Sequence, residues 1–123
     1  MIYIQTKLNI NDNSGIKLAQ CLKIYKKKTG KIGDIILISI KNLKLNNKKK
    51  IKISKGDLLK AIIIYTKYKN KNTIGNLIKF DINSIIILNN QNKPLGTRIF
   101  GPITSYFRKI KKFKILSLSN QII

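Results

Sequence analysis

The stretch Asp34-Ile35-Ile36-Leu37-Ile38-Ser39-Ile40-Lys41 decides the fold of this chain. Side chains of a strand alternate between two faces, so residues 36, 38 and 40 share one face and residues 35, 37 and 39 share the other. Both faces are largely apolar, as expected of a strand in a closed barrel with a further layer packed outside it. Isoleucine dominates the stretch, and a β-branched side chain favours strands.

Further short strands are predicted on both sides of this stretch, separated by turns rich in Asn, Asp and Gly. They cover residues 2–10, 18–25, 58–67, 76–80 and 84–88. Residues 42–55 are predicted to form a ribbon with a basic tip, in which 43–45 pair with 51–53. Residues 103–112 can form a helix after Pro102, and 114–118 are expected to be strand-like or irregular. The pattern predicts one domain, residues 1–123, with an all-β barrel fold and a small helical appendage at the C-terminus.

The charge of the chain is strongly one-sided, with 26 Lys and Arg against 4 Asp and Glu and a net charge of +22. A compact monomer with this charge repels itself, so a polyanionic partner is predicted, and nucleic acid is the commonest one. Codon composition explains part of the charge, because Ile, Lys and Asn share A- and U-rich codons and make up 65 of the 123 residues. The lysines nevertheless gather in four clusters, at 26–28, 48–52, 67–71 and 109–114, where their point charges can hold phosphates.

Several other kinds of chemistry are excluded by what the chain lacks. It has no His and a single cysteine, Cys21, for which a packed or half-exposed thiol is predicted, so a metal site is not expected. The four acidic residues lie in turns or at strand ends, where structural roles are expected, so neither catalysis nor a cofactor is predicted; they are Asp12, Asp34, Asp57 and Asp81. No apolar run approaches the roughly 20 residues that span a bilayer, so no membrane partner is expected.

The two arginines, Arg98 and Arg108, are rare beside 24 lysines. A guanidinium can fork onto a phosphate or stack on a base, which an ammonium cannot do. Aromatic side chains can also stack on unpaired bases, although packing in the barrel is the favoured role for each of them; the candidates are Tyr25, Tyr65, Tyr68 and Phe100.

The chain resembles the universal large-subunit ribosomal protein fourteen family, bacterial and organellar type. The two most specific matching segments are Asp12-Asn13-Ser14-Gly15 and Gly96-Thr97-Arg98-Ile99-Phe100-Gly101-Pro102. Shorter matches follow in the same order along the whole chain; they are Leu8-Asn9, Ile32-Gly33-Asp34-Ile35-Ile36, Lys55-Gly56-Asp57, Lys60-Ala61-Ile62-Ile63-Ile64, Lys112-Phe113-Lys114-Ile115 and Ser117-Leu118. The family carries acidic residues on its C-terminal helix, whereas this chain has Ser105-Tyr106-Phe107-Arg108-Lys109.

The resemblance implies a small five-stranded barrel with a projecting β-ribbon and short C-terminal helices. It implies a structural constituent of the large ribosomal subunit, without enzymatic activity, that binds large-subunit rRNA and contributes to the bridge face toward small-subunit rRNA. Implied protein partners are neighbours resembling ribosomal proteins L-three and L-nineteen and a ribosome silencing factor that docks on the same face. Thr97, Arg98 and Lys112 are the candidates for this intersubunit face. The candidates for rRNA binding are Lys7, Asn13, Lys17, Lys26, Lys27, Lys28, Lys48, Lys49, Lys50, Lys52, Lys67, Lys69, Lys71, Arg108 and Lys109.

One other function is compatible with the pattern, a free single-strand binder or RNA chaperone with an OB-like barrel. A cationic membrane-surface protein is disfavoured, because the chain lacks a long basic amphipathic helix. The location is predicted from composition and from the start of the chain. Met1 leads directly into Ile2-Tyr3-Ile4, so no presequence is expected. Together with the Ile, Lys and Asn usage, this favours an organelle-encoded protein of a mitochondrial ribosome, with a plastid or the cytoplasm of an A+T-rich bacterium as alternatives.

Overall fold

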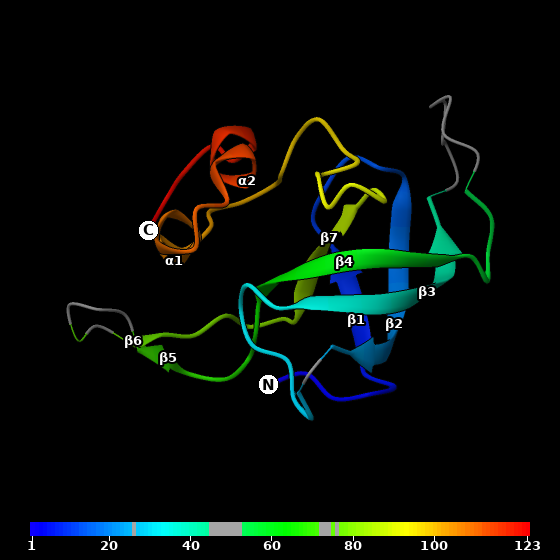
Figure 1. Ribbon diagram of the computed structural model, residues 1–123, viewed down its shortest axis with the longest axis horizontal. Helices are drawn as coiled ribbons and strands as arrows, with labels where there is room; N and C mark the ends of the chain where they lie inside the picture. Colours follow the sequence, from blue (N-terminus) through cyan, green and yellow to red (C-terminus); the bar gives the residue numbers. More distant parts are fainter. Residues whose placement is uncertain (26, 45–52, 72–74, 76) are drawn as a thin grey trace.

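The computed structural model describes residues 1–25, 27–44, 53–71, 75 and 77–123. Five strands close a barrel in the order β1-β2-β3-β4-β7 (Figure 1). Their bounds are Lys7–Ile10 for β1, Ile16–Ile24 for β2, Ile35–Leu43 for β3, Leu58–Tyr65 for β4 and Ser84–Leu88 for β7. Neighbouring strands are antiparallel except for β1 and β7, which run parallel and complete the closure. The all-β barrel expected from the sequence is therefore confirmed.

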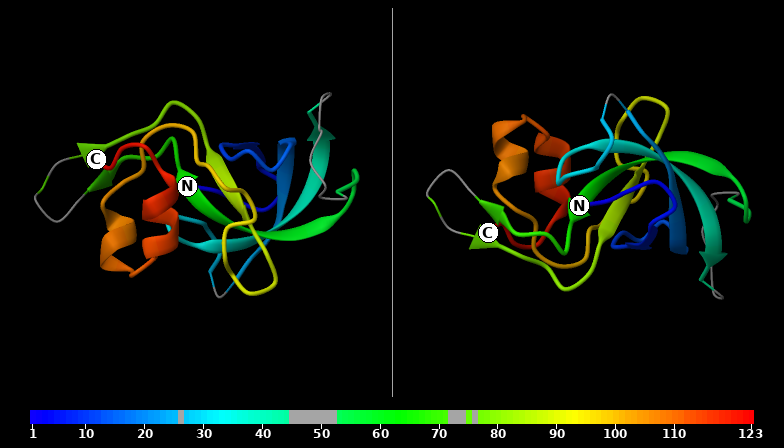
Figure 2. Two further views of the ribbon diagram at one scale, coloured as in Figure 1. Left: turned by 90° about the horizontal axis from the view of Figure 1, so that it is seen from above. Right: turned by 90° about the horizontal axis from the view of Figure 1, so that it is seen from below.

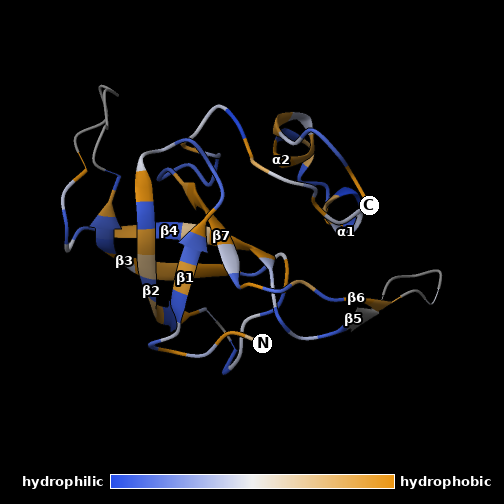
Figure 3. Cartoon of the chain, turned by 180° about the vertical axis from the view of Figure 1, so that it is seen from behind, coloured by the Kyte–Doolittle hydropathy of each residue, from blue (hydrophilic) through white to orange (hydrophobic). Residues whose placement is uncertain are grey.

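The barrel interior is filled by the apolar side chains that alternate along its strands. In β1, Leu8 and Ile10 are buried whereas Lys7 and Asn9 are exposed, and Figure 3 shows apolar and polar residues following one another along β1 and β2. In β3, the predicted inner face of residues 36, 38 and 40 lies in this core. The free thiol of Cys21 on β2 is buried there as well, as the sequence predicts.

A second apolar core lies outside the barrel, under two short helices. These are α1, Tyr106–Lys109, and α2, Phe113–Leu118, which lie beside each other in every view (Figures 1 and 2). Phe107 and Ile115 from the helices share this core with Ile62 and Ile86 from β4 and β7. The sequence predicts that residues 34–41 are buried on both faces. In the structure this burial is most complete in β4 and β7. In β3, the partly buried Ile35 packs against the second core.

The predictions for the C-terminal segment were partly wrong. The helix predicted over 103–112 is restricted to α1, because Ile103 forms a β-bridge with Ile122 and Lys111 has a φ of 60° that ends helical geometry. Residues 114–118, expected to be strand-like or irregular, belong to α2, whose Leu116 N–H donates to the carbonyl of Lys112 at 3.3 Å. A helix of six residues is too short to display a clear apolar period in the sequence.

The N-terminal strand also differs from the expectation, whereas most of the predicted ribbon is not described. Residues 2–10 do not form one strand, since Ile2 pairs with Gly30 and Gln5, with a φ of 73°, turns the chain before β1 begins. The pairing of 43–45 with 51–53 and its basic tip fall largely outside the described residues. A projecting ribbon is formed by β5, Asn70–Lys71, and β6, Leu77–Ile78, within segments predicted as a loop and a longer strand. Figure 2 shows this ribbon extending on the same side as the helices.

Burial of Cys21 leads to a pH-dependent prediction. Burial raises the pKa of its thiol above the ordinary value of 9.0, so the unfolded chain loses this proton more readily than the folded chain. The free energy of unfolding should therefore be unaffected by this group at pH 7 and should fall as the pH rises above 9. Urea unfolding at pH 7 and 9.5 measures this loss, and Cys21→Ala should lack it. An equal pH dependence in the variant and the parent protein would contradict the assignment.

Candidate nucleic-acid interface

The side chain of Asn13 holds the segment that contains Arg98. Residues 96–102, called the Arg98 loop from here on, lie against the turn between β1 and β2. The Asn13 Oδ1 accepts the backbone N–H groups of Thr97 at 2.9 Å and Arg98 at 3.2 Å, and its Nδ2 donates to the Thr97 Oγ1 at 2.8 Å. Gly96 permits this approach, because a Cβ there would lie 2.7 Å from the Asn13 Oδ1. These contacts fix the backbone from which the exposed Arg98 side chain extends.

The buried carboxylate of Asp12 anchors the same turn to the barrel. Asp12 is 2% exposed. Its Oδ1 accepts the N–H of Ser14 at 3.1 Å and the hydroxyl of Ser14 at 2.5 Å, and its Oδ2 accepts the N–H of Ile87 in β7 at 3.0 Å. Asp12 also pairs with Ile99 through a β-bridge. Three donors compensate the carboxylate for its loss of water, which supports the structural role predicted for it.

Phe100 is exposed on the Arg98 loop beside two cations. Phe100 is 42% exposed, and the centroid of its ring lies 5.7 Å from the Lys44 Nζ and 5.7 Å from the Arg98 Cζ. Lys44 follows β3, and its N–H donates to the carbonyl of Gly15 at 2.9 Å. Lys44 was not among the residues predicted from the sequence. Nothing in the sequence distinguishes it from other lysines, since its position beside Phe100 depends on how β3 pairs with β2.

The end of the Arg98 loop is fixed by Tyr65. Its hydroxyl donates to the carbonyl of Pro102 at 2.5 Å, and its ring stacks on Phe80 with centroids 4.0 Å apart. Burial raises the pKa of Tyr65, and a hydrogen bond with the Asn11 side chain partly offsets this rise. The buried ring is occupied by packing, which is the role the sequence favoured, whereas Phe100 keeps an accessible ring.

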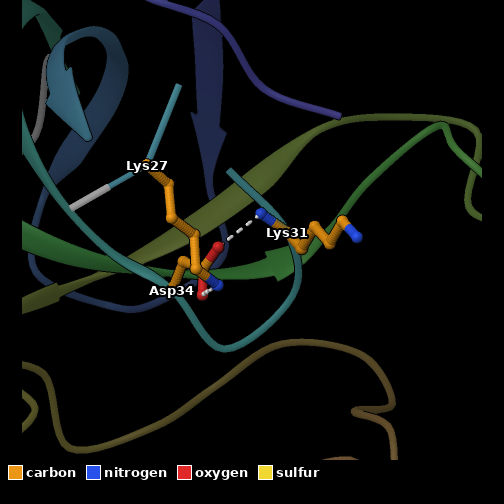
Figure 4. Close-up of polar contacts among 3 residues, drawn as sticks. All are labelled: Lys27, Lys31 and Asp34. Atoms are coloured by element: carbon orange, nitrogen blue, oxygen red, sulfur yellow. Dashed lines mark hydrogen bonds and ion pairs between the residues drawn. The ribbon is translucent and has the colours of Figure 1, made fainter. Parts of the chain in front are cut away.

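The basic loop before β3 is organised around Asp34 (Figure 4). The Asp34 Oδ1 lies 3.0 Å from the Lys27 Nζ, and the Asp34 Oδ2 accepts the N–H of Lys31 at 2.8 Å. The loop is also tied to the N-terminal segment, because Ile2 and Gly30 exchange two backbone hydrogen bonds. Lys27 is thus paired with an acid, while Lys28 and Lys31 are exposed, and Figure 4 shows the Lys31 side chain directed away from Asp34. Lys31 was not predicted as a site residue.

The remaining candidates that the structure describes lie on several different elements. Exposed side chains are found on β1, β2, the segment after β4 and α1; they are Lys7, Lys17, Lys67, Lys69, Arg108 and Lys109. Lys26, Lys48, Lys49, Lys50 and Lys52 lie outside the described residues, as does the side chain of Lys71. Lys112 is half-buried and lies at the start of α2. The N–H of Ile99, the residue after Arg98, donates to the carbonyl of Leu118 at the other end of that helix. Asn13, Thr97 and Arg98 are therefore brought together, and Lys112 lies apart from their hydrogen-bond network.

Among the described residues, no group of His, Cys, Asp or Glu is placed to hold a metal ion. Within the same part of the chain, no helix is long and apolar enough to cross a membrane. The fold and its exposed cations define a small basic barrel suited to holding a phosphate backbone. The family model described as ribosomal protein L14p/L23e matches residues 1–123, and the chain belongs to this family. It is a non-enzymatic structural protein of the large ribosomal subunit that binds rRNA, as the resemblance implied.

The junction between Gly101 and Tyr65 gives a prediction for the Arg98 loop. Gly101 has a φ of +84°, and a Cβ there would lie 2.6 Å from the Tyr65 Oη. Gly101→Ala should therefore destabilise the protein by at least about 1 kcal/mol, through backbone strain and this clash. In a Tyr65→Phe background the clash is absent, so the same substitution should cost less. Urea unfolding of the four proteins measures the difference, and equal costs in both backgrounds would exclude the clash.

Proposed function

We propose that residues 1–123 act as a single domain that holds large-subunit rRNA with its basic loops and presents the Arg98 loop to the small subunit. The observation that carries the proposal is that the Arg98 side chain is exposed while Asn13 fixes the Arg98 backbone. A cation whose backbone is held in place loses less conformational freedom on binding than a mobile one. This arrangement suits a defined contact between two large particles.

The rRNA-binding surface proposed here consists of exposed lysines on anchored segments. Lys28 is the clearest example of such a lysine. Its loop is bonded to Asp34 and Ile2, while its own side chain is exposed. Lys27 is paired with Asp34, so we assign it to shaping the loop more than to holding phosphate. Lysines bind phosphate as point charges, so this surface positions the protein without reading base sequence.

The Arg98 loop supports a contact of a different kind. A guanidinium donates two parallel hydrogen bonds to one phosphate, which gives a defined orientation as well as charge. We assign Thr97 and Arg98 to the face that meets small-subunit rRNA and on which a ribosome silencing factor docks. Lys112 would join this face from the start of α2. The neighbours on the large subunit would resemble ribosomal proteins L-three and L-nineteen.

The helix surface bears on how such a factor would dock. The last turn of α1 carries Arg108 and Lys109, and its first turn carries no acidic residue. A partner that contacts α1 of this chain would therefore need acidic or neutral groups.

The composition also supports an organellar ribosome, with the mitochondrial matrix favoured over a plastid or an A+T-rich bacterial cytoplasm.

Lys28 allows a direct test of phosphate binding. Each phosphate contact on duplex nucleic acid contributes about 0.9 to the slope of log affinity against log salt concentration. Lys28→Gln should lower this slope by about that amount on a large-subunit rRNA fragment. Lys55→Gln, at an exposed lysine outside the proposed set, is the matched control and should leave the slope unchanged. Equal slopes for Lys28→Gln and the parent protein would remove Lys28 from the interface.

Arg98→Lys tests the intersubunit assignment, because it keeps the charge and removes the fork. Large subunits that carry this variant should assemble normally and join small subunits more weakly, by about tenfold if one bidentate contact is lost. Joining is measured by sedimentation of mixed subunits over a range of magnesium concentrations. Lys55→Gln, at an exposed lysine outside the proposed surfaces, is the control and should leave joining unaltered.

Substitutions at Asn13 separate position from charge in the same assay. Asn13→Ala removes the acceptor for the N–H groups of Thr97 and Arg98 and should weaken joining although Arg98 is retained. Asn13→Asp keeps this acceptor and should restore most of the joining. Normal joining by both Arg98→Lys and Asn13→Ala particles would refute the assignment of this loop to the interface.

A further inference from the structure

The Phe100 ring is both accessible and held in place. A phenylalanine that is 42% exposed lies well outside the second core, although its neighbour Ile99 is buried there. Two cations lie at 5.7 Å from its centroid, Lys44 from the end of β3 and Arg98 from the Arg98 loop. Both cations lie over the ring, where attraction to its π-electrons restricts its orientation.

The backbones that carry these three side chains are fixed to one turn of the barrel. The N–H of Phe100 donates to the carbonyl of Asn11 at 2.7 Å. Lys44 is bonded through its N–H to Gly15, and Arg98 through its N–H to Asn13. All three partners belong to residues 11–15, between β1 and β2. An exposed aromatic residue and two cations close to its ring are thus assembled before any ligand arrives, which lowers the entropy lost on binding.

We propose that Lys44, Phe100 and Arg98 form a platform for one unpaired rRNA nucleotide, whose base stacks on Phe100 and whose phosphates contact the two cations. The inference rests on the proposed function, which makes rRNA the ligand of this face. Bases inside a helix are stacked on their neighbours, so only a bulged or looped nucleotide can present a free face to the ring. Stacking on an aromatic ring tolerates any base. The platform therefore selects unpaired over paired nucleotides and does not select one base.

The test uses the full chain and two RNA hairpins that contain 2-aminopurine, whose fluorescence is quenched by stacking. In one hairpin the 2-aminopurine is bulged, and in the other it is paired with uracil. The protein should change the fluorescence of the bulged base and leave that of the paired base unaltered. Phe100→Leu should abolish this change and weaken binding to the bulged hairpin on the order of tenfold. Phe113→Leu, which removes a ring that is 59% exposed on α2, should have neither effect.

The lysine is tested with a matched pair of substitutions. Lys44→Gln should weaken binding to the bulged hairpin and reduce its salt dependence by about 0.7 in slope, the contribution of one contact on unpaired RNA. Lys23→Gln removes a lysine that also lies over a ring, that of Tyr25 at 5.3 Å, and should leave the fluorescence change intact. Circular dichroism of every variant verifies that it is folded.

Two results would overturn the platform. The first is an unchanged fluorescence response in folded Phe100→Leu protein, and the second is an equal response from both hairpins. Failure of the proposed function is a separate result. If Arg98→Lys subunits join normally while the fluorescence response still depends on Phe100, the assignment of Arg98 to the subunit interface is refuted and the platform stands. If Arg98→Lys subunits join weakly and the fluorescence response does not depend on Phe100, the platform is refuted and the assignment to the interface stands.

Discussion

The Asp12 carboxylate connects the parts of the molecule on which the candidate interface depends. It is buried, and its oxygens bind the turn between β1 and β2 through Ser14 and the strand β7 through Ile87. Its backbone pairs with Ile99 in the Arg98 loop. A buried carboxylate is costly unless each oxygen has donors. The positions of the turn, the strand and the loop are therefore coupled through Asp12, because its carboxylate binds the turn and the strand while its backbone pairs with the loop.

Asn13 extends this arrangement from the core to the surface. Where Asp12 is directed into the barrel, the next residue is directed outward and bonds to Thr97 and Arg98. One turn thus connects the interior to the most specific cation of the chain. The segments Asp12–Gly15 and Gly96–Pro102, which are far apart in sequence and are the two most specific matches in the family resemblance, are thus in direct contact.

The sequence predicted the barrel because its strands obey a simple rule of alternation. In β1 and β3 the inward residues are apolar, and five short strands with tight turns have few arrangements available to them. The C-terminal helices were harder to predict, since α1 and α2 are shorter than two helical turns and their buried residues, such as Phe107 and Ile115, are specified by contacts with the outer face of β4 and β7. The cluster at Phe100 was only partly predictable. The resemblance indicated Arg98, but Lys44 joins it through pairing between strands that no local pattern reveals.

Closure of the barrel has a consequence for how the chain folds as it is synthesised. β1 pairs with β7 in parallel, and the bond between Asp12 and Ile87 joins residues 75 apart. The first strand of the barrel therefore lacks one of its two neighbours until most of the chain has left the translating ribosome. Contacts between distant residues also make folding slow. During this interval the isoleucine-rich strands are exposed on a nascent chain whose net charge is +22. Repulsion between chains of the same charge opposes aggregation, so the excess of lysine has a physical effect before the protein meets its RNA.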